Sequence, residues 1–249
     1  LTRIAAAAAL AAATALPAAA FDIDAMTDAE RAAFNDAVRA YLLDNPEVIM
    51  EAVNVLEARQ AAAQDQADAD LIAANAEALF DDGVSWVGGN PDGDVTVVEF
   101  LDYRCGYCRR AMPEVARLIE TDGNVRFVVK EFPILGEDSV RASRFAIATR
   151  NVAGDDAYKA VHDRLMALQG AINDAALGRL ARDAELDADA ILAAMDDPAV
   201  TQELRANRAL AETLQINGTP AFVLEDRLVR GYVPYDRMQA IVDSVRADG

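Results

Sequence analysis

The sequence predicts a mixed α/β fold that carries a helical insertion and is preceded by a helical extension. Three observations support this fold class. The apolar run Val95–Leu101 is rich in β-branched residues, as expected of a strand buried on both faces. A helical segment to about Ile119 and a second β-prone run, Val125–Val129, follow it and complete a strand–helix–strand unit with a right-handed crossover. Residues 138–215 then show no strand pattern, and residues 27–80 show helical periodicity.

The helical extension begins with a capping box. Thr27 is followed three residues later by Glu30, and apolar residues then recur at helical spacing (Phe34, Val38, Tyr41, Leu42). Asn45 is a good N-cap and Pro46 suits a first helical position, so we expect a second helix that runs to about Phe80.

The apolar face of residues 34–56 has no obvious cover in the sequence. Between Glu57 and Asp70 the apolar content falls to alanine, which predicts a solvated helical spacer with few tertiary contacts. Two short helices are too small to bury an apolar face well. We therefore expect self-association through this segment. The alternative is that the segment folds back on the rest of the chain.

The remaining elements follow from local patterns. A short strand is expected at Val84–Val87, before the turn-rich stretch Gly88–Gly93, and Trp86 is expected in the core. Strands resume at Ala221–Leu224 and Leu228–Arg230, joined by a turn at residues 225–227. Helices are expected at Ser139–Arg150, Tyr158–Leu168, Ala175–Ala184, Thr201–Leu214 and Tyr235–Val245.

The first residues have the pattern of a secretory signal. Arg3 precedes an apolar run to Leu16, and the small residues Ala18–Ala20 offer a cleavage site after Ala20. The alternative is an alanine-rich helix of the mature protein. We expect residues 1–20 to be a signal peptide, residues 21–82 an oligomerisation segment with a linker helix, residues 83–249 the catalytic domain, and the location to be the periplasm.

The charge balance argues against nucleic acid as a partner. The chain has 23 Lys and Arg against 42 Asp and Glu, for a net charge of −19. Binding to phosphates requires a basic face, so the acidity is expected to serve solubility.

The two cysteines, Cys105 and Cys108, are separated by only two residues. A loop this small removes little unfolded-state entropy, so a structural disulfide is a poor explanation for it. The pair follows a buried strand and opens a helix, where free N–H groups and the helix dipole favour a thiolate. We expect Cys105 to be the nucleophile and Cys108 the resolving thiol.

Metal binding is the alternative use of this pair. Zinc takes four ligands, and besides the two cysteines the chain has only His162, which is expected to be a solvated or partly buried helix residue without a catalytic role. Two thiolates could hold Cu(I). We expect no metal site and no cofactor beyond the redox-active pair.

Several motifs in order resemble a known family. VVEFLDYR at residues 97–104 precedes the cysteines, KEFPILG follows at 130–136 and NGTPA at 217–221. Over about residues 84–247 the chain resembles the DsbA-like branch of the thioredoxin superfamily, which implies a thioredoxin-like fold with an inserted helical subdomain. The stretch YLLDNPEVI at residues 41–49 resembles the ScsC (suppressor of copper sensitivity protein C) group, in which an N-terminal helical segment oligomerises DsbA-like domains.

The resemblance implies roles for further residues. Pro220 matches a cis-proline that, with Thr219, helps to hold an extended substrate; a trans proline at a strand start is the alternative. Glu99 matches a buried acid that could move the proton of Cys108, although it could also be an ordinary strand residue. Pro113 matches a helix kink. The dipeptide Gly106-Tyr107 lies where strongly oxidising members carry Pro-His, so we expect a less oxidising site.

These features favour a disulfide isomerase or reductase that acts on misfolded exported proteins. Its partners would then be those clients and a membrane thiol reductase, and the resemblance favours a trimer over a dimer. The second hypothesis is a monomeric dithiol oxidase. A third, from another class, is a Cu(I)-binding copper-tolerance protein.

Overall fold

The computed structural model describes residues 25–248, which fall into two compact units. The change from one unit to the other lies within a helix, between Arg59 and Gln60. The predicted signal segment 1–20 lies outside the described residues, and the predicted domain boundaries stay predictions. No helix of residues 25–248 is both long and apolar enough to span a membrane.

The first unit contains α1 (Asp28–Asp44) and the beginning of α2 (Glu47–Ala74). The capping box is confirmed: the Glu30 N–H donates to the Thr27 hydroxyl oxygen, and the Thr27 N–H donates to the Glu30 carboxylate at 2.9 Å. Asn45 caps the end of α1 instead of the start of α2, because its Nδ2 donates to the Tyr41 carbonyl at 2.9 Å. No residue of α1 is buried.

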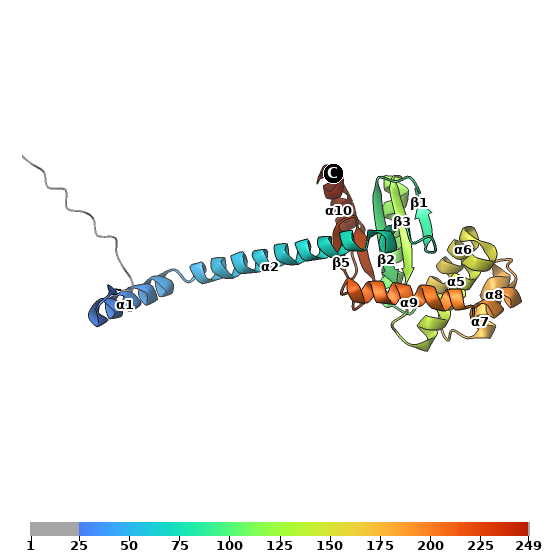
Figure 1. Cartoon of the computed structure of the whole chain (residues 1–249), viewed down its shortest axis with the longest axis horizontal. Coiled ribbons are helices and arrows are strands. Elements are labelled where there is room, and N and C mark those ends of the chain that lie inside the picture. Colours follow the sequence, from blue (N-terminus) through green and yellow to red (C-terminus); the bar gives the residue numbers. More distant parts are fainter. Residues whose placement is uncertain (1–24, 249) are drawn as a thin grey trace, which may run out of the picture. The chain divides into compact units, whose positions relative to one another are not determined.

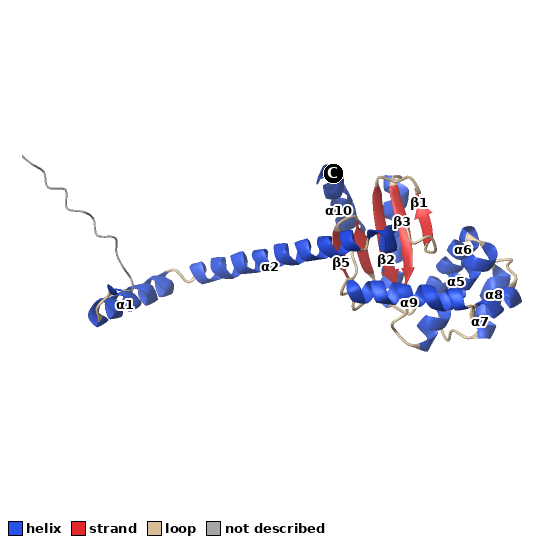
Figure 2. Cartoon of the chain, viewed as in Figure 1, coloured by secondary structure: helices blue, strands red, loops and turns tan. Residues whose placement is uncertain are grey.

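The second unit is built on a five-stranded sheet of order β1-β3-β2-β4-β5 (Figures 1 and 2). The strands are β1 (Trp86–Gly89), β2 (Val95–Leu101), β3 (Val125–Glu131), β4 (Ala221–Leu224) and β5 (Arg227–Arg230). Strands β2 and β3 are parallel, and the other three pairs are antiparallel. The mixed α/β class, with its strand–helix–strand unit, is therefore confirmed.

Strand β1 lies two residues later than predicted, because its glycines pair with β3. Gly88 and Gly89 pair with Phe127 and Arg126. A Cβ at Gly89, where φ is +70°, would lie 2.3 Å from the Val125 carbonyl oxygen, so only glycine allows this close approach. The glycines that suggested a turn instead complete the strand.

Helices cover both faces of the sheet. Helices α4 (Gly106–Asp122) and α10 (Tyr235–Asp248) pack on the face that carries Val97. Helices α3 (Ala76–Phe80) and α9 (Pro198–Thr213) pack on the opposite face, which carries Val98. Because side chains alternate along a strand, Glu99 points to the α4 side.

The insertion between β3 and β4 contains five helices, of which α9 is the last. The others are α5 (Glu137–Ala153), α6 (Asp155–Ala167), α7 (Asp174–Asp183) and α8 (Ala188–Ala194). Helix α8 was not predicted, because seven residues are too few to show helical periodicity. Its start is nevertheless marked by Asp187, whose side chain accepts from the Ala190 N–H at 3.0 Å.

Residues 60–70 of the predicted spacer belong to the second unit. Asp68 is buried and accepts two hydrogen bonds from the Arg230 guanidinium, at 2.7 and 2.9 Å. The predicted single helix to Phe80 is divided at Asn75, whose Nδ2 donates to the Leu71 carbonyl at 2.8 Å. Residues 57–67 are exposed, as expected of the spacer, and the expectation of few tertiary contacts is wrong at Asp68.

Candidate active site

The loop that carries Cys105 is fixed by a buried carboxylate. Asp102 follows β2 directly and is fully buried. Its oxygens accept the N–H groups of Arg104 at 2.7 Å, Ile134 at 2.8 Å and Leu135 at 3.0 Å. The Cys105 N–H donates to the Asp102 carbonyl at 3.0 Å. The chain therefore enters α4 along a single well-defined path.

The two thiols differ in access to solvent. Cys105 is the N-cap of α4 and is 7% exposed, whereas Cys108, one turn into the helix, is 0% exposed. Both are free thiols. Burial raises the pKa of Cys108, and the nearby Glu99 and Cys105 raise it further. Of the two cysteines, Cys105 therefore has both the greater exposure and the position at the helix N-terminus.

Thr219 and Pro220 lie beside Cys105. The Cys105 Sγ is 3.1 Å from the Thr219 carbonyl oxygen, to which the thiol donates. The Thr219–Pro220 peptide bond is cis, as the resemblance implied. Pro220 is buried, and its carbonyl accepts the Gly231 N–H at 2.9 Å. The two predicted substrate-binding residues are thus adjacent to the predicted nucleophile.

Glu99 is a buried acid next to the cysteines. It is 4% exposed, and its Oε1 has no hydrogen-bond partner among residues 25–248. Burial raises the pKa of Glu99 to about 8, with contributions from the charges of Cys105 and Glu131. The side chain lines a cavity of about 170 Å³ together with Val115 and Phe127. A carboxyl group with this pKa can both hold and release a proton near neutral pH.

The dipeptide between the cysteines is open to solvent. A Cβ at Gly106 would have no neighbour within 4 Å, so no steric contact requires glycine there. Tyr107 is 60% exposed, and its ring centroid lies 6.5 Å from that of Tyr232. Pro113 lies inside α4, as expected.

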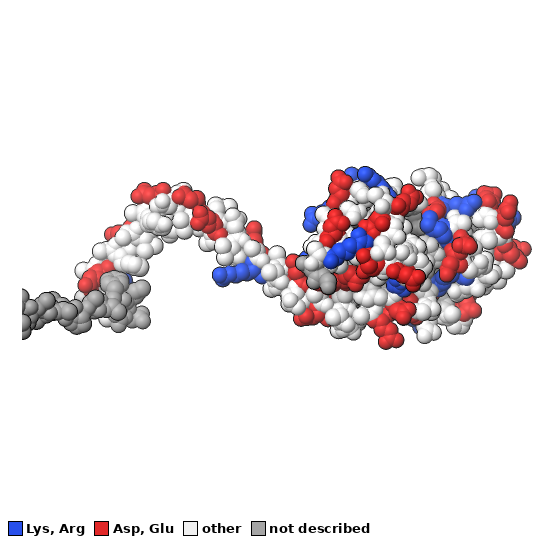
Figure 3. Space-filling view, turned by 90° about the horizontal axis from the view of Figure 1, so that it is seen from above, with Lys and Arg blue, Asp and Glu red and all other residues white. Residues whose placement is uncertain are grey.

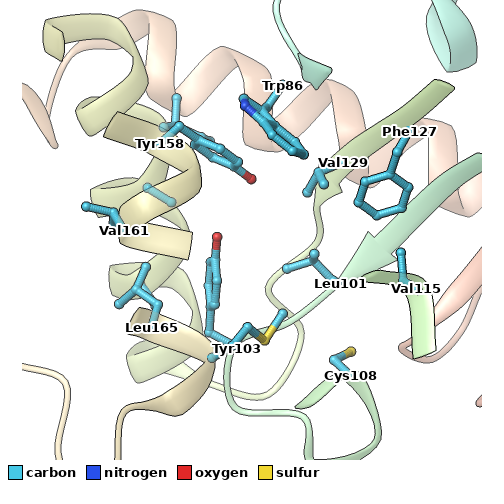
Figure 4. Close-up of a cluster of buried hydrophobic side chains, with 14 of the residues drawn as sticks. Trp86, Leu101, Tyr103, Cys108, Val115, Phe127, Val129, Tyr158, Val161 and Leu165 are labelled. Atoms are coloured by element: carbon cyan, nitrogen blue, oxygen red, sulfur yellow. The ribbon is translucent and has the colours of Figure 1, made fainter. Parts of the chain in front are cut away.

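A buried hydrogen-bond network next to the site was missed by sequence analysis. The hydroxyls of Tyr103 and Tyr158 both donate to Glu131 Oε1 at 2.7 Å, and Ser143 donates to Oε2 at 2.7 Å. Figure 4 shows the two tyrosine rings pointing toward one another, with Cys108 nearby. Burial raises the pKa of Glu131 to about 7, although the three hydrogen bonds oppose that shift. The only signal for this network was a Glu at the end of an apolar strand.

The prediction for His162 is corrected. This residue is buried at 6% exposure, and its Nδ1 lies 3.1 Å from the Tyr103 hydroxyl. Burial lowers its pKa to about 4. The alanine-rich helix suggested a solvated or partly buried position, but His162 is buried and its ring stacks on Tyr158. Trp86 is a core residue, as predicted, and its Nε1 donates to the Asp155 carbonyl at 3.1 Å.

The residues present offer limited means of holding a metal. No group of three or more His, Cys, Asp or Glu within residues 25–248 is placed to hold an ion. The two thiols remain as a pair of soft ligands.

A dithiol at the start of a helix that follows a buried strand, with a slightly exposed first thiol and a fully buried second thiol near an acid, is the site of a thiol–disulfide oxidoreductase. A family model described as DSBA-like thioredoxin domain matches residues 96–243. The chain belongs to that family. A second model, the copper resistance protein ScsC N-terminal domain, matches residues 30–63.

Solved structures agree with this assignment. A thioredoxin-like oxidoreductase from Silicibacter pomeroyi is 47% identical, with a TM-score of 0.65 over 69% of this chain and 97% of that one. A linker-deletion mutant of Proteus mirabilis ScsC is 27% identical, with a TM-score of 0.67 over 92% of this chain and 100% of that one. The thioredoxin-like fold with a helical insertion and an N-terminal helical extension is therefore confirmed.

Curated relatives match about two thirds of the chain. The antiporter NhaA 1 of Salinispora arenicola is 30% identical over 162 residues, which are 65% of this chain and 24% of that protein. The chain thus spans about a quarter of the length of the antiporters it matches. Disulfide bond formation protein D of Bacillus subtilis is 23% identical over 62% of this chain and 74% of that protein.

Proposed function

We propose that this chain is a periplasmic protein disulfide isomerase or reductase that acts on exported proteins through Cys105 and Cys108. The observation that carries the proposal is the asymmetry of the two thiols at the start of α4. Cys105, at the N-terminus of α4 beside Thr219, keeps 7% of its surface exposed, whereas Cys108 is fully buried near Glu99. The reduction of a client disulfide needs an attacking thiolate that the client can reach and a second thiol that resolves the mixed disulfide.

The reduction of a client disulfide takes two exchange steps. The Cys105 thiolate attacks one client sulfur, forms a mixed disulfide and releases the other client sulfur as a thiolate. Cys108 then attacks the Cys105 sulfur, so that the Cys105–Cys108 disulfide forms and the client leaves with two thiols. Cys108 must lose its proton in the second step, and Glu99 is the buried group that can accept it. In isomerisation, a different thiolate of the same client attacks the client sulfur of the mixed disulfide, so that a new client disulfide forms and the Cys105 thiolate is released.

The dipeptide Gly106-Tyr107 supports the reducing direction. Neither residue offers a cation to stabilise a thiolate, and the single histidine of the chain is buried with Tyr103. A less stabilised thiolate makes the disulfide form less oxidising. A membrane thiol reductase would keep Cys105 reduced.

The exposed apolar face of the first unit supports self-association. Exposed apolar residues of α1 and the start of α2 include Phe34, Val38, Tyr41 and Leu56, and none of residues 25–59 is buried. A face of this kind needs a cover. The ScsC N-terminal domain match covers the same segment. We propose a homotrimer, with a dimer as the alternative stoichiometry.

Reactivation of scrambled ribonuclease by the full chain tests the activity. An isomerase restores ribonuclease activity at catalytic concentrations, and Cys105→Ser abolishes the effect. If the chain only oxidises reduced ribonuclease and leaves the scrambled form inactive, the dithiol oxidase hypothesis replaces this one.

Light scattering tests the self-association. Val38→Asp places a charge on the apolar stripe of α1, and Ala40→Asp places the same charge on the opposite side of that helix. We expect the first variant to lower the mass in solution and the second to leave it unchanged. A monomeric wild type would refute the oligomer.

Copper binding is a second candidate function, favoured by the copper resistance description of the matched N-terminal domain and by the two free thiols. Competition for Cu(I) against a coloured chelator, with the Cys105→Ser and Cys108→Ser double variant as control, tests it. Copper uptake that is identical in the double variant would exclude the thiols as its site.

A further inference from the structure

One face of α4 continues the surface around Cys105. Residues at spacings of three and four share a helix face, and four of them do so here: Tyr107, Arg110, Glu114 and Arg117. Tyr232, which precedes α10, and Tyr235, its first residue, lie against them. We call these six residues the aromatic–arginine surface. This surface adjoins the active site, because the N–H of Gly231, the residue before Tyr232, donates a hydrogen bond to the Pro220 carbonyl.

Two guanidinium groups of this surface lie on tyrosine rings. The Arg110 Cζ is 4.5 Å from the Tyr232 ring centroid, and the Arg117 Cζ is 3.9 Å from the Tyr235 centroid. Stacking holds an arginine in place while its N–H groups at the edge stay free to donate. Both arginines are exposed, and neither forms an ion pair with any residue that the structure describes.

The acid in this surface is already satisfied. The Glu114 carboxylate accepts the Tyr232 hydroxyl at 3.1 Å and the Tyr235 N–H at 3.2 Å. The neighbouring Asp236 and Arg237 carry opposite charges. The donors to Glu114 are uncharged, so Glu114 keeps its negative charge, and the six residues of this surface together carry two positive charges and one negative charge.

The local charge is opposite to that of the whole protein. Residues 103–118 contain four arginines and one glutamate, whereas the chain carries −19. Acidic side chains are spread over the surface seen in Figure 3. The negative charge over most of the protein surface would repel an anionic client. The positive charges beside Cys105 would instead attract such a client to the aromatic–arginine surface.

We propose that the aromatic–arginine surface binds an extended client segment with aspartate or glutamate close to its reactive cysteine. Arg110 and Arg117 would donate to the carboxylates, and the exposed ring of Tyr107 would contact the segment between them and Cys105. The inference rests on the proposed thiol–disulfide exchange and names the client sequences for which that exchange is fastest.

The test uses the reduced full-length protein and three peptides of equal length. Each peptide has one cysteine in a mixed disulfide with 5-thio-2-nitrobenzoate and is flanked by Asp and Glu, by Asn and Gln, or by Lys. Attack of Cys105 on the peptide sulfur forms the Cys105–peptide disulfide and releases the coloured thiolate, whose absorbance gives the rate constant. The ratio of the acidic to the neutral peptide within one variant cancels any effect of a substitution on the thiol itself.

We expect the acidic peptide to react about threefold to tenfold faster than the neutral one at low ionic strength, and the advantage to shrink with added salt. Arg110→Gln combined with Arg117→Gln should bring the ratio to about one. Arg205→Gln is the control, because it removes the charge of an exposed arginine on α9, which packs on the opposite sheet face. It should keep the wild-type ratio.

Three results would overturn the inference. The first is an equal rate for acidic and neutral peptides in the wild type. The second is a ratio unchanged in the double variant, and the third is a ratio lowered equally by Arg205→Gln, which would indicate the overall charge alone. If none of the three peptides reacts, the proposed exchange activity itself is refuted, and this inference with it.

Discussion

Replacing Glu99 by glutamine should flatten the dependence of stability on pH between pH 5 and pH 8. The native pKa of Glu99 is about 8, above the 4.5 of the unfolded chain, because burial disfavours the charged form. The native protein therefore binds more protons than the unfolded chain in this range. The stability contribution is intact below about pH 4.5 and is lost as the pH rises toward 8.

The magnitude follows from the size of the shift. With about 1.4 kcal/mol for each pKa unit, the wild type should lose about 3 kcal/mol more than Glu99→Gln in free energy of unfolding between pH 5 and pH 8. Glu131, whose pKa is raised to about 7, titrates in both proteins, and because its charge contributes to the pKa of Glu99 the difference includes the coupling between the two groups.

Urea unfolding of the reduced protein at pH 5, 6, 7 and 8 measures this difference. Trp86 is the sole tryptophan of the chain and lies in the core beside the sheet, so its fluorescence follows the second unit. Glu120→Gln, at an exposed position of α4, is the matched control and should behave as the wild type does. Parallel curves for wild type and Glu99→Gln would refute the assignment of Glu99 as a buried, protonated acid.

Two further predictions concern other buried charges. Lys130→Met should lower the free energy of unfolding, measured in urea titrations, by about 3 kcal/mol. The Lys130 side chain is fully buried, and its Nζ donates to the Ala78 carbonyl at 2.7 Å, to Asp82 at 2.7 Å and to the Ser85 hydroxyl at 3.0 Å. A loss below about 0.5 kcal/mol, as expected for an exposed lysine such as Lys159, would contradict this prediction. His162→Gln should make the free energy of unfolding less sensitive to acid. The native pKa of His162 is about 4, below the unfolded value of 6.5, so its contribution to stability is complete above pH 6.5 and falls by about 3 kcal/mol as the pH is lowered to 4. Circular dichroism melts at pH 4 and pH 7 measure that difference, and equal acid sensitivity in both proteins would show that His162 is not its source.

Local sequence patterns were sufficient for the parts of the fold that are defined by neighbours in the chain. Strands β2 and β4 have the predicted bounds, because their apolar runs end where the buried sheet ends. The capping box at Thr27 depends on a spacing of three residues and was predicted correctly. The cysteine pair and its place at the start of α4 were visible for the same reason.

Contacts between distant segments were not visible. The Asp68–Arg230 pair joins residues 162 positions apart, so Asp68 was predicted to be part of a solvated spacer. The network on Glu131 gathers hydroxyls from Tyr103, Ser143 and Tyr158, which lie on separate elements. His162 was misplaced because its buried position depends on that network and not on the alanines around it.

The central claim is that Cys105 attacks the client disulfide and Cys108 resolves the mixed disulfide. Mass spectrometry of the full chain after reaction with a client peptide disulfide tests this claim most directly. Cys108→Ser should accumulate a mixed disulfide between the peptide and Cys105, because the resolving thiol is missing. The wild type should instead form the Cys105–Cys108 disulfide and release the peptide as a thiol. A peptide adduct on Cys108 of Cys105→Ser, formed at the wild-type rate, would contradict the account.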